Sequence, residues 1–139
     1  MTTAREIMTG GVECVGESES VLDAARRMEE LGVGALPICG DDDRLKGMVT
    51  DRDIVVKVLA AGKEPGSTRA GELGGGEVVT IGADDDLEEL VRTMAEHEVK
   101  RVPVIDGHRL VGVVSERDLA EHAAPDQVVA VVRGVYADH

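Results

Sequence analysis

Two stretches of the sequence carry residues that could hold a ligand. GMVTDRD occurs near residue 50 and GVVSERD near residue 115, so a hydroxyl residue, Thr50 or Ser115, stands three positions before an aspartate, Asp53 or Asp118. An ionised carboxylate can accept hydrogen bonds from the vicinal hydroxyls of a ribose. A hydroxyl and free backbone N–H groups where a helix begins suit a phosphate. The residue types therefore suit a phosphorylated sugar.

A structural explanation competes with ligand binding. Thr and Ser are common helix N-caps, and acidic residues in a first turn favour the helix dipole. However, both copies also have a glycine three residues before the hydroxyl, Gly47 or Gly112. A glycine inside a strand lets a ligand or another backbone approach closely. The presence of two equivalent copies favours the binding interpretation.

The two stretches belong to an internal repeat. Pro37 and Pro103 lie 66 residues apart (103 − 37), whereas Gly47 and Gly112 lie 65 apart (112 − 47), so the second copy lacks one residue in a turn. The pattern predicts a tandem duplication of small α/β (α+β) units. Its parts are repeat one at 2–62, a linker at 63–67, repeat two at 68–125 and a C-terminal tail at 126–139.

Each repeat reads β-α-β-β-α from its apolar periodicity and its turn residues. In repeat one the predicted elements are a strand at 12–15, a helix at 21–31, strands at 35–39 and 45–50, and a helix at 52–62. In repeat two we expect a helix capped by Asp86, a hairpin across Asp106 and Gly107, and a last helix that stops before Pro125. Pro37 and Pro103 fall in predicted strands, which suggests strand starts or edges.

Composition excludes several classes of function. The net charge is −13, from 15 basic and 28 acidic residues, and the one aromatic residue is Tyr136, so we expect no nucleic-acid partner. No apolar run approaches the roughly 18 residues of a membrane span, and the N-terminus does not read as a signal peptide. A cytoplasmic protein is the expectation. No hydrolase, P-loop or dinucleotide motif is present, so we expect no enzyme.

With these motifs in hand, the sequence resembles a stand-alone pair of CBS domains, also called a Bateman module. LPIC followed by GMVTDRD, and VPVI followed by GVVSERD, carry the resemblance, which extends from TAREIM to about Pro125. It implies two repeats packed sheet to sheet about a pseudo-twofold axis. It also implies clefts between them that take AMP, ADP, ATP or S-adenosylmethionine. Such a module is expected to be homodimeric and to regulate an unidentified protein partner in trans, with no required cofactor.

The resemblance assigns roles to residues in both repeats. Thr50 and Ser115 would face the ribose-phosphate, while Asp53 and Asp118 would hold the ribose hydroxyls. The residues expected to frame the adenine lie near Cys14 and Val79 and in the segments that contain Ala35, Pro37 and Pro103. Repeat two also has Lys100 and Arg101 just before its Val-Pro pair, where repeat one has Gly34 and Ala35. We therefore expect repeat two to bind phosphorylated ligands more tightly.

Two cysteines, Cys14 and Cys39, both lie on predicted strands of repeat one. They are either buried free thiols in a reducing cytosol or a disulfide. A disulfide would crowd the expected adenine position and make the first site redox-dependent.

His97 and His122 each end a predicted helix of repeat two. Exposed histidines at helix ends commonly interact with the helix dipole. Alternatively, the two histidines could meet two from a second copy and form a four-imidazole zinc site. A stress-associated structural, redox- or metal-responsive dimer that binds no nucleotide is thus the competing hypothesis.

Overall fold

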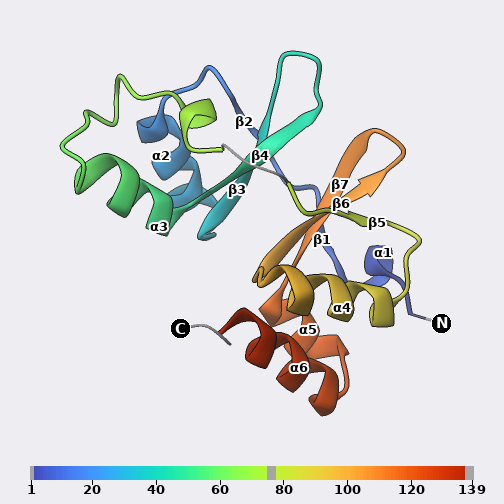
Figure 1. The fold of residues 1–139 in the computed structure, drawn as a ribbon. Helices are drawn as coiled ribbons and strands as arrows, with labels where there is room; N and C mark the ends of the chain where they lie inside the picture. The colour runs from blue at the N-terminus through green and yellow to red at the C-terminus, as the bar shows by residue number, and fades with distance from the viewer. Residues whose placement is uncertain (1, 75–77, 137–139) are drawn as a thin grey trace. The chain divides into compact units, whose positions relative to one another are not determined.

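The structure is a computed structural model that describes residues 2–74 and 78–136, and the chain forms two compact units (Figure 1). Unit 1 contains residues 1–12 and 79–139, and unit 2 contains residues 13–78. These boundaries differ from those of the sequence repeats. The first residues of each repeat belong to the unit that holds the other repeat.

Unit 2 has a three-stranded sheet in the order β2-β3-β4, with β2 parallel and β4 antiparallel to β3. Its elements are β2 (Val15–Gly16), α2 (Val21–Leu31), β3 (Ala35–Cys39), β4 (Leu45–Thr50), α3 (Asp51–Asp53), the π-helical turn η1 (Ile54–Leu59) and the 3-10 turn η2 (Ala70–Glu72). Helices α2 and α3 lie on one side of the sheet (Figure 1).

The sequence explains the limits of α2. The side chain of Ser20 accepts a hydrogen bond from the Asp23 N–H, and Gly32 ends the helix in the left-handed conformation at φ 67°. Val21, Ala24 and Met28 recur at helical spacing and are buried in the core of unit 2. The predicted helix at 21–31 is confirmed, as are the strands at 35–39 and 45–50.

The helix expected at 52–62 differs in form. It begins one residue earlier, as the α-helical turn α3, and continues as the π-helical turn η1 up to Leu59. Its inner face buries Ile54 and Val58, whereas Val55, Val56 and Leu59 are exposed. The strand expected at 12–15 is also shifted, because β2 pairs with β3 only from Val15 onward.

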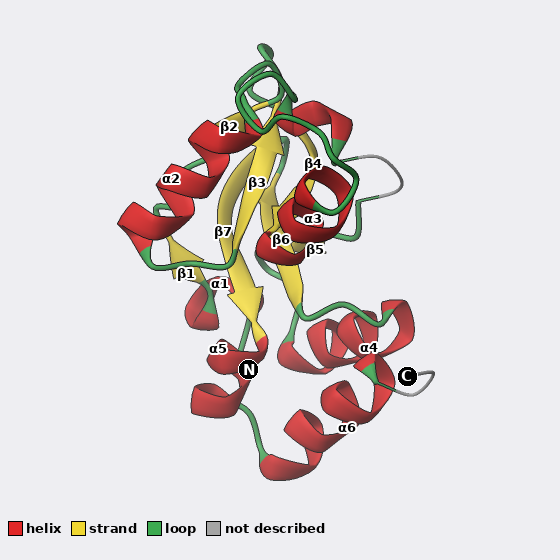
Figure 2. Cartoon of the chain, turned by 90° about the vertical axis from the view of Figure 1, so that its left-hand side faces the viewer, coloured by secondary structure: helices red, strands yellow, loops and turns green. Residues whose placement is uncertain are grey.

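Unit 1 has a four-stranded sheet in the order β1-β7-β6-β5 (Figure 2). Its elements are α1 (Ala4–Ile7), β1 (Thr9–Gly10), β5 (Ile81–Gly82), α4 (Leu87–His97), β6 (Arg101–Asp106), β7 (Arg109–Ser115), α5 (Glu116–His122) and α6 (Pro125–Val135). Asp86 caps α4, and the hairpin turns at Gly107 and His108. The cap agrees with the prediction for repeat two, whereas the hairpin turn lies one residue later than expected, because Asp106 still pairs with Arg109 in the sheet.

The tail forms a helix, α6, that packs on α4 and α5 (Figure 1). Pro125 stands at its start, where a missing N–H costs no hydrogen bond. Val131 and Val135 are buried in the core of unit 1. Gly134 lies so close to α4 that an added Cβ would meet the carbonyl oxygen of Ala95 at 2.6 Å. Residues 137–139 of the predicted tail, including His139, lie outside the described residues.

Equivalent hydrogen bonds show that the leading segment of each repeat pairs with residues of the other repeat. The Ala4 N–H donates to the Asp85 carbonyl at 2.9 Å, and the Ala70 N–H donates to the Glu19 carbonyl at 2.8 Å. Ala70 lies 66 residues after Ala4, and Asp85 lies 66 after Glu19 (70 − 4 and 85 − 19). The leading segment of each repeat therefore binds at the same place in the other repeat.

The expectation that Pro37 and Pro103 start strands or lie on edge strands is wrong. Both are buried inside β3 and β6, each of which has a neighbour on both sides. The parallel neighbour pairs only from the next residue onward, at Ile38 in β3 and Val104 in β6. A proline, which lacks an N–H, therefore fits in the interior of these strands.

Candidate functional site

The candidate site of repeat one is built on the capping box that starts α3. The Thr50 N–H donates to Oδ2 of Asp53 at 3.0 Å, and the Asp53 N–H donates to the Thr50 hydroxyl at 3.0 Å. The other carboxylate oxygen, Oδ1, lies 3.3 Å from Nζ of Lys57. The Asp53 side chain is 22% exposed. One oxygen thus holds the helix start, and the other faces a cation.

Repeat two has the same capping box with a different outer partner. The Ser115 N–H donates to Oδ2 of Asp118 at 2.8 Å, and the Asp118 N–H donates to the Ser115 hydroxyl at 3.4 Å. Oδ1 of Asp118 accepts a hydrogen bond from the Thr9 hydroxyl at 3.3 Å. Asp118 is only 9% exposed. This carboxylate is therefore more enclosed than that of Asp53.

The structural explanation considered for these motifs is thus present: both pairs cap helices. Capping uses one oxygen of each carboxylate, so it is compatible with a ligand on the other. Sequence reasoning missed both partners of the outer oxygens. Lys57 follows Asp53 at the i+4 spacing of a helical ion pair, so the sequence alone could have indicated this contact. Thr9 lies 109 residues from Asp118, and no local pattern connects them.

Backbone contact explains why glycine occurs at positions 47 and 112. An added Cβ at Gly47 would lie 2.6 Å from the carbonyl oxygen of Gly74. An added Cβ at Gly112 would lie 2.7 Å from the carbonyl oxygen of Thr9. Of the two reasons foreseen for these glycines, the structure shows the approach of another backbone.

The basic residues of repeat two take different positions. Arg101 begins β6 opposite Ser115, whereas its counterpart Ala35 lies opposite Thr50 in unit 2. Side chains of directly paired residues lie on the same face of a sheet, so Arg101 is placed beside the motif. Nζ of Lys100 lies 4.9 Å from the ring centre of Tyr136 and therefore interacts with the end of α6.

Glu116 adds a buried acceptor next to the motif of repeat two. Its Oε1 is buried and accepts no hydrogen bond from any residue that the structure describes. Buried side-chain oxygens are normally paired.

Cys14 and Cys39 form a disulfide in the structure. The free-thiol alternative is therefore not what the structure shows. Arg27 reinforces this region, because its Nη1 donates to the Cys14 carbonyl at 2.8 Å and its Nη2 lies 3.1 Å from Glu19. The hydrogen bond from Arg27, joined by one from the Gly16 N–H, lowers the pKa of Glu19 below its ordinary value. Val79, the counterpart expected near the adenine of the other site, is partly buried two residues before β5.

The two candidate zinc ligands end α4 and α5 of unit 1, both of which contact α6. His97 is the last residue of α4 and His122 the last residue of α5, and both are exposed. Nε2 of His122 lies 4.0 Å from a Glu121 carboxylate oxygen. Within residues 2–74 and 78–136, no group of three or more His, Cys, Asp or Glu side chains could hold a metal ion. A zinc site at these histidines would need ligands from a second copy.

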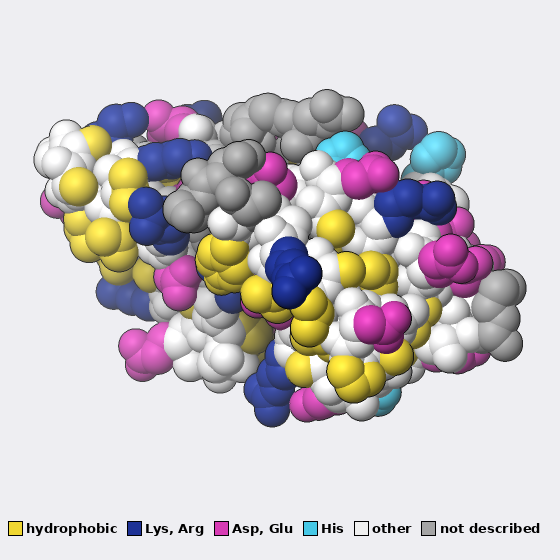
Figure 3. All heavy atoms as spheres, turned by 60° about the horizontal axis from the view of Figure 1, so that its bottom comes forward, with side chains coloured by type: hydrophobic (Ala, Val, Ile, Leu, Met, Phe, Trp, Pro, Cys, Tyr) yellow, Lys and Arg dark blue, Asp and Glu magenta, His cyan; other side chains and the backbone are white. Residues whose placement is uncertain are grey.

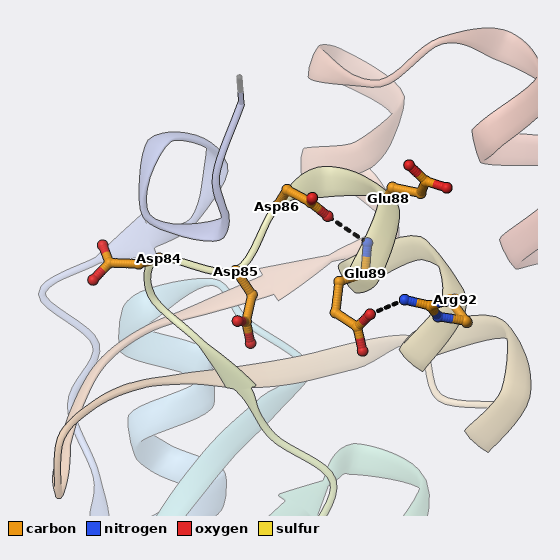
Figure 4. A pocket seen from close by; sticks show the side chains of 6 residues that line it. All are labelled: Asp84, Asp85, Asp86, Glu88, Glu89 and Arg92. Atoms are coloured by element: carbon orange, nitrogen blue, oxygen red, sulfur yellow. Dashed lines mark hydrogen bonds and ion pairs between the residues drawn. The ribbon is translucent and has the colours of Figure 1, made fainter.

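A shallow hollow of about 430 Å³ lies at the start of α4 (Figure 4). Its lining residues are Asp84, Asp85, Asp86, Glu88, Glu89 and Arg92. The Asp86 carboxylate accepts the Glu89 N–H at 2.8 Å, and Arg92 pairs with Glu89. Five carboxylates against one guanidinium would repel a phosphate, so the hollow is unsuited to a nucleotide.

No helix in the described segments is long and apolar enough to cross a membrane.

Comparisons with known proteins agree with the repeats. The CBS domain family matches residues 4–60 and 70–124. Hypoxic response protein 1 of Mycobacterium tuberculosis is 53% identical over 135 residues, which span 97% of this chain and 94% of the relative. The CBS domain-containing protein YhcV of Bacillus subtilis is 36% identical over 120 residues, or 86% of this chain and 84% of the relative.

Solved structures extend the comparison. The crystal structure of Hypoxic Response Protein I with two coordinated zinc ions is 55% identical, has a TM-score of 0.81, and covers 88% of this chain and 100% of its own. CBSX2 in complex with AMP is 25% identical, with a TM-score of 0.75, and covers 88% of this chain and 96% of its own. Both repeats and nearly the full length are matched, so this chain belongs to the CBS domain family and carries two CBS domains in tandem.

Proposed function

We propose that this chain is a regulatory module that binds adenosyl nucleotides, such as AMP, ADP, ATP or S-adenosylmethionine, at its two Thr/Ser–Asp motifs. Binding would control a separate protein partner, since no motif in the sequence suggests a reaction of its own. The observation that carries the proposal is the arrangement of both carboxylates. Each uses Oδ2 for its capping box and presents Oδ1 to a hydrogen-bond donor or a cation.

Further support comes from the surroundings of Asp118. Arg101, opposite Ser115, can neutralise a phosphate. Among the structures similar to this chain, CBSX2 was crystallised in complex with AMP. We therefore expect repeat two to be the tighter site for phosphorylated ligands.

Calorimetric titration tests the proposal. AMP, adenosine, ATP and S-adenosylmethionine are titrated into the chain at fixed salt. Hydrogen bonds to a charged group contribute ~1.5–3 kcal/mol, so Asp118→Ala should weaken AMP binding about ten- to a hundredfold, and Asp53→Ala should weaken it less. Arg101→Ala should weaken AMP binding much more than adenosine binding. The absence of binding by the wild type, both reduced and oxidised, would contradict the proposal.

We also infer that the module is a homodimer. Large apolar side chains are exposed on both units, and Figure 3 shows apolar side chains gathered on the face that includes α6. Those of unit 2 lie at the end of α2 and along η1, and they are Leu31, Val33, Val55, Val56 and Leu59. Those on α6 and at its end are Val129, Val132 and Tyr136. Apolar groups that a second copy covers would no longer be in contact with water.

A second function is favoured by the disulfide between Cys14 and Cys39. A stress-associated dimer that responds to redox state or to zinc, and binds no nucleotide, would use this bond and a site shared by the histidines of two copies. The zinc ions of the crystallised Hypoxic Response Protein I are consistent with that alternative. Elemental analysis of the untagged protein separates the two hypotheses. About one zinc per pair of chains, lost in His97→Ala, together with no nucleotide binding, would favour the second.

A further inference from the structure

Thr9 holds the outer oxygen of Asp118 from a distant part of the chain. It lies on β1, which pairs with β7 through Thr9 and Val113, and its hydroxyl donates to Oδ1 at 3.3 Å. Thr9 itself is exposed, whereas Asp118 is 9% exposed. The Thr9 hydroxyl therefore lies between solvent and Oδ1 of Asp118, the carboxylate oxygen that the capping box does not use.

The first repeat lacks this arrangement. The residue 66 positions after Thr9 is Gly75 (75 − 9), which lies outside the described residues and whose type has no hydroxyl. Oδ1 of Asp53 faces Lys57 instead. The counterpart of Lys57 in repeat two is His122 (122 − 57 = 65), which lies beside Glu121. The two carboxylates thus differ in the chemistry of their outer partner.

We propose that Thr9 is a specificity-determining residue of the second repeat, because its hydroxyl occupies the position on Asp118 that one hydroxyl of a ribose would take. This inference rests on the proposed nucleotide function. A diol that displaces Thr9 exchanges one hydroxyl–carboxylate hydrogen bond for another, so Thr9 offsets part of the affinity that the bond to Asp118 would otherwise contribute. Thr9 therefore determines how strongly the second site favours a ribose over a sugar that lacks the diol.

The test is the variant Thr9→Val in an Asp53→Ala background, which isolates the second site. Valine keeps the branched shape and the strand preference of threonine but has no hydroxyl. Adenosine and AMP should both bind about tenfold more tightly, the lower end of the range for a hydrogen bond to a charged group, because the Thr9 bond is long at 3.3 Å and Thr9 is exposed. Thr9→Ser, which keeps a hydroxyl, should show a much smaller gain.

A ligand without the ribose diol tests whether the substitution has changed the structure of β1 instead of removing one hydrogen bond. Thr9→Val should leave the affinity of 2′,3′-dideoxyadenosine unchanged, because that ligand has no hydroxyl to offer Asp118. Equal tightening of adenosine and dideoxyadenosine would mean that the variant had altered the strand, and would overturn the inference. Melting curves verify folding, and Thr9→Ala replaces Thr9→Val if the valine variant does not fold.

The possible outcomes distinguish a failure of the role proposed for Thr9 from a failure of the proposed nucleotide function. Equal adenosine affinity in the wild-type and valine proteins overturns the role of Thr9 and leaves the proposed function intact. Binding of adenosine by Thr9→Val alone supports both. No nucleotide binding by any variant, including those with Asp53 retained, overturns the proposed function and the inference together.

Discussion

Asp118 is the one charged residue, within the described part of the chain, that is buried. It accepts hydrogen bonds from the backbone and hydroxyl of Ser115 and from Thr9. A buried carboxylate with several donors supports the fold as well as any ligand. At the scale of single residues, loss of binding in a variant therefore has to be separated from loss of stability.

Asp118→Ala should lower the free energy of unfolding by about 1–3 kcal/mol, because the capping box and the Thr9 contact lose their acceptor. Asp53→Ala should lower it less, since the Asp53 side chain is more exposed and its outer partner is the mobile ammonium of Lys57. Urea denaturation followed by circular dichroism measures both. Asp41→Ala, at an exposed turn position of the same unit, is the control. Equal losses in the two variants would contradict this ranking.

Glu19 provides a prediction on pH. Its pKa is lowered from an ordinary value of 4.5, first by the hydrogen bond from Arg27. A carboxyl whose folded pKa lies below its unfolded pKa stabilises the fold above the unfolded value, and that stabilisation is lost as the pH falls through the folded value. Glu19→Gln should therefore destabilise the protein at about pH 7, and the destabilisation should shrink progressively as the pH falls below 4.5. Urea midpoints at several pH values check this, and a constant difference would rule it out.

At the scale of elements, local signals predicted most of the fold. Ser20 and Gly32 bracket α2, Asp86 starts α4, and the turn at Gly107 sets the second hairpin. The exchange of leading segments left no such signal, because it depends on contacts between residues such as Ala4 and Asp85 that are far apart in the chain. The hydrogen bond between Thr9 and Asp118 also joins residues that are far apart in the chain and left no local signal. The sequence therefore predicted the motif residues but not all the residues that contact them.

Gly134 gives a prediction for α6. In an exposed helix, Gly→Ala stabilises by about 0.5–1 kcal/mol. Here the new Cβ would meet backbone atoms of Ala95 at 2.6 and 2.7 Å, so Gly134→Ala should instead destabilise unit 1. The matched control is Ala130, exposed on the same helix, where Ala130→Gly should cost only the ordinary helix preference. Thermal unfolding measures both, and a stabilised Gly134→Ala would show that α6 can move away.

At the scale of the whole molecule, the two units are reinforced in different ways. Unit 2 contains the disulfide, which links residues 25 positions apart, and unit 1 contains α6. In the chain-entropy treatment a crosslink over such a loop contributes about 3 kcal/mol. Redox conditions should therefore affect one unit more than the other.

Reduction should raise hydrogen exchange in residues 13–74 and leave that of residues 79–136 nearly unchanged. Exchange measured by mass spectrometry, with and without reductant, resolves the units by peptide. Cys14→Ser with Cys39→Ser is the covalent control and should reproduce the reduced pattern. Equal changes in both units would mean that the disulfide acts on the entire chain.

The exposed apolar residues give a prediction on assembly. Leu59 and Val55 are 56% and 55% exposed. If a second copy covers them, Leu59→Glu should shift the mass measured by light scattering from dimer to monomer, because burying an unpaired charge is costly. Lys63→Glu, a charge change at an exposed position outside the apolar set, is the control. A dimer that survives Leu59→Glu would exclude this surface.

The exchange of leading segments also has a consequence for synthesis of the chain. Unit 2 is continuous from residue 13 to 78, so it can fold as soon as those residues leave the ribosome. Unit 1 needs α1 at one end of the chain and Val131 and Val135 near the other, which share a single core. Residues 4–10, which form α1 and β1, therefore lack their partners until the segments that complete unit 1 have been made. Their apolar members, Ala4 and Ile7, stay accessible to chaperones and proteases during that interval.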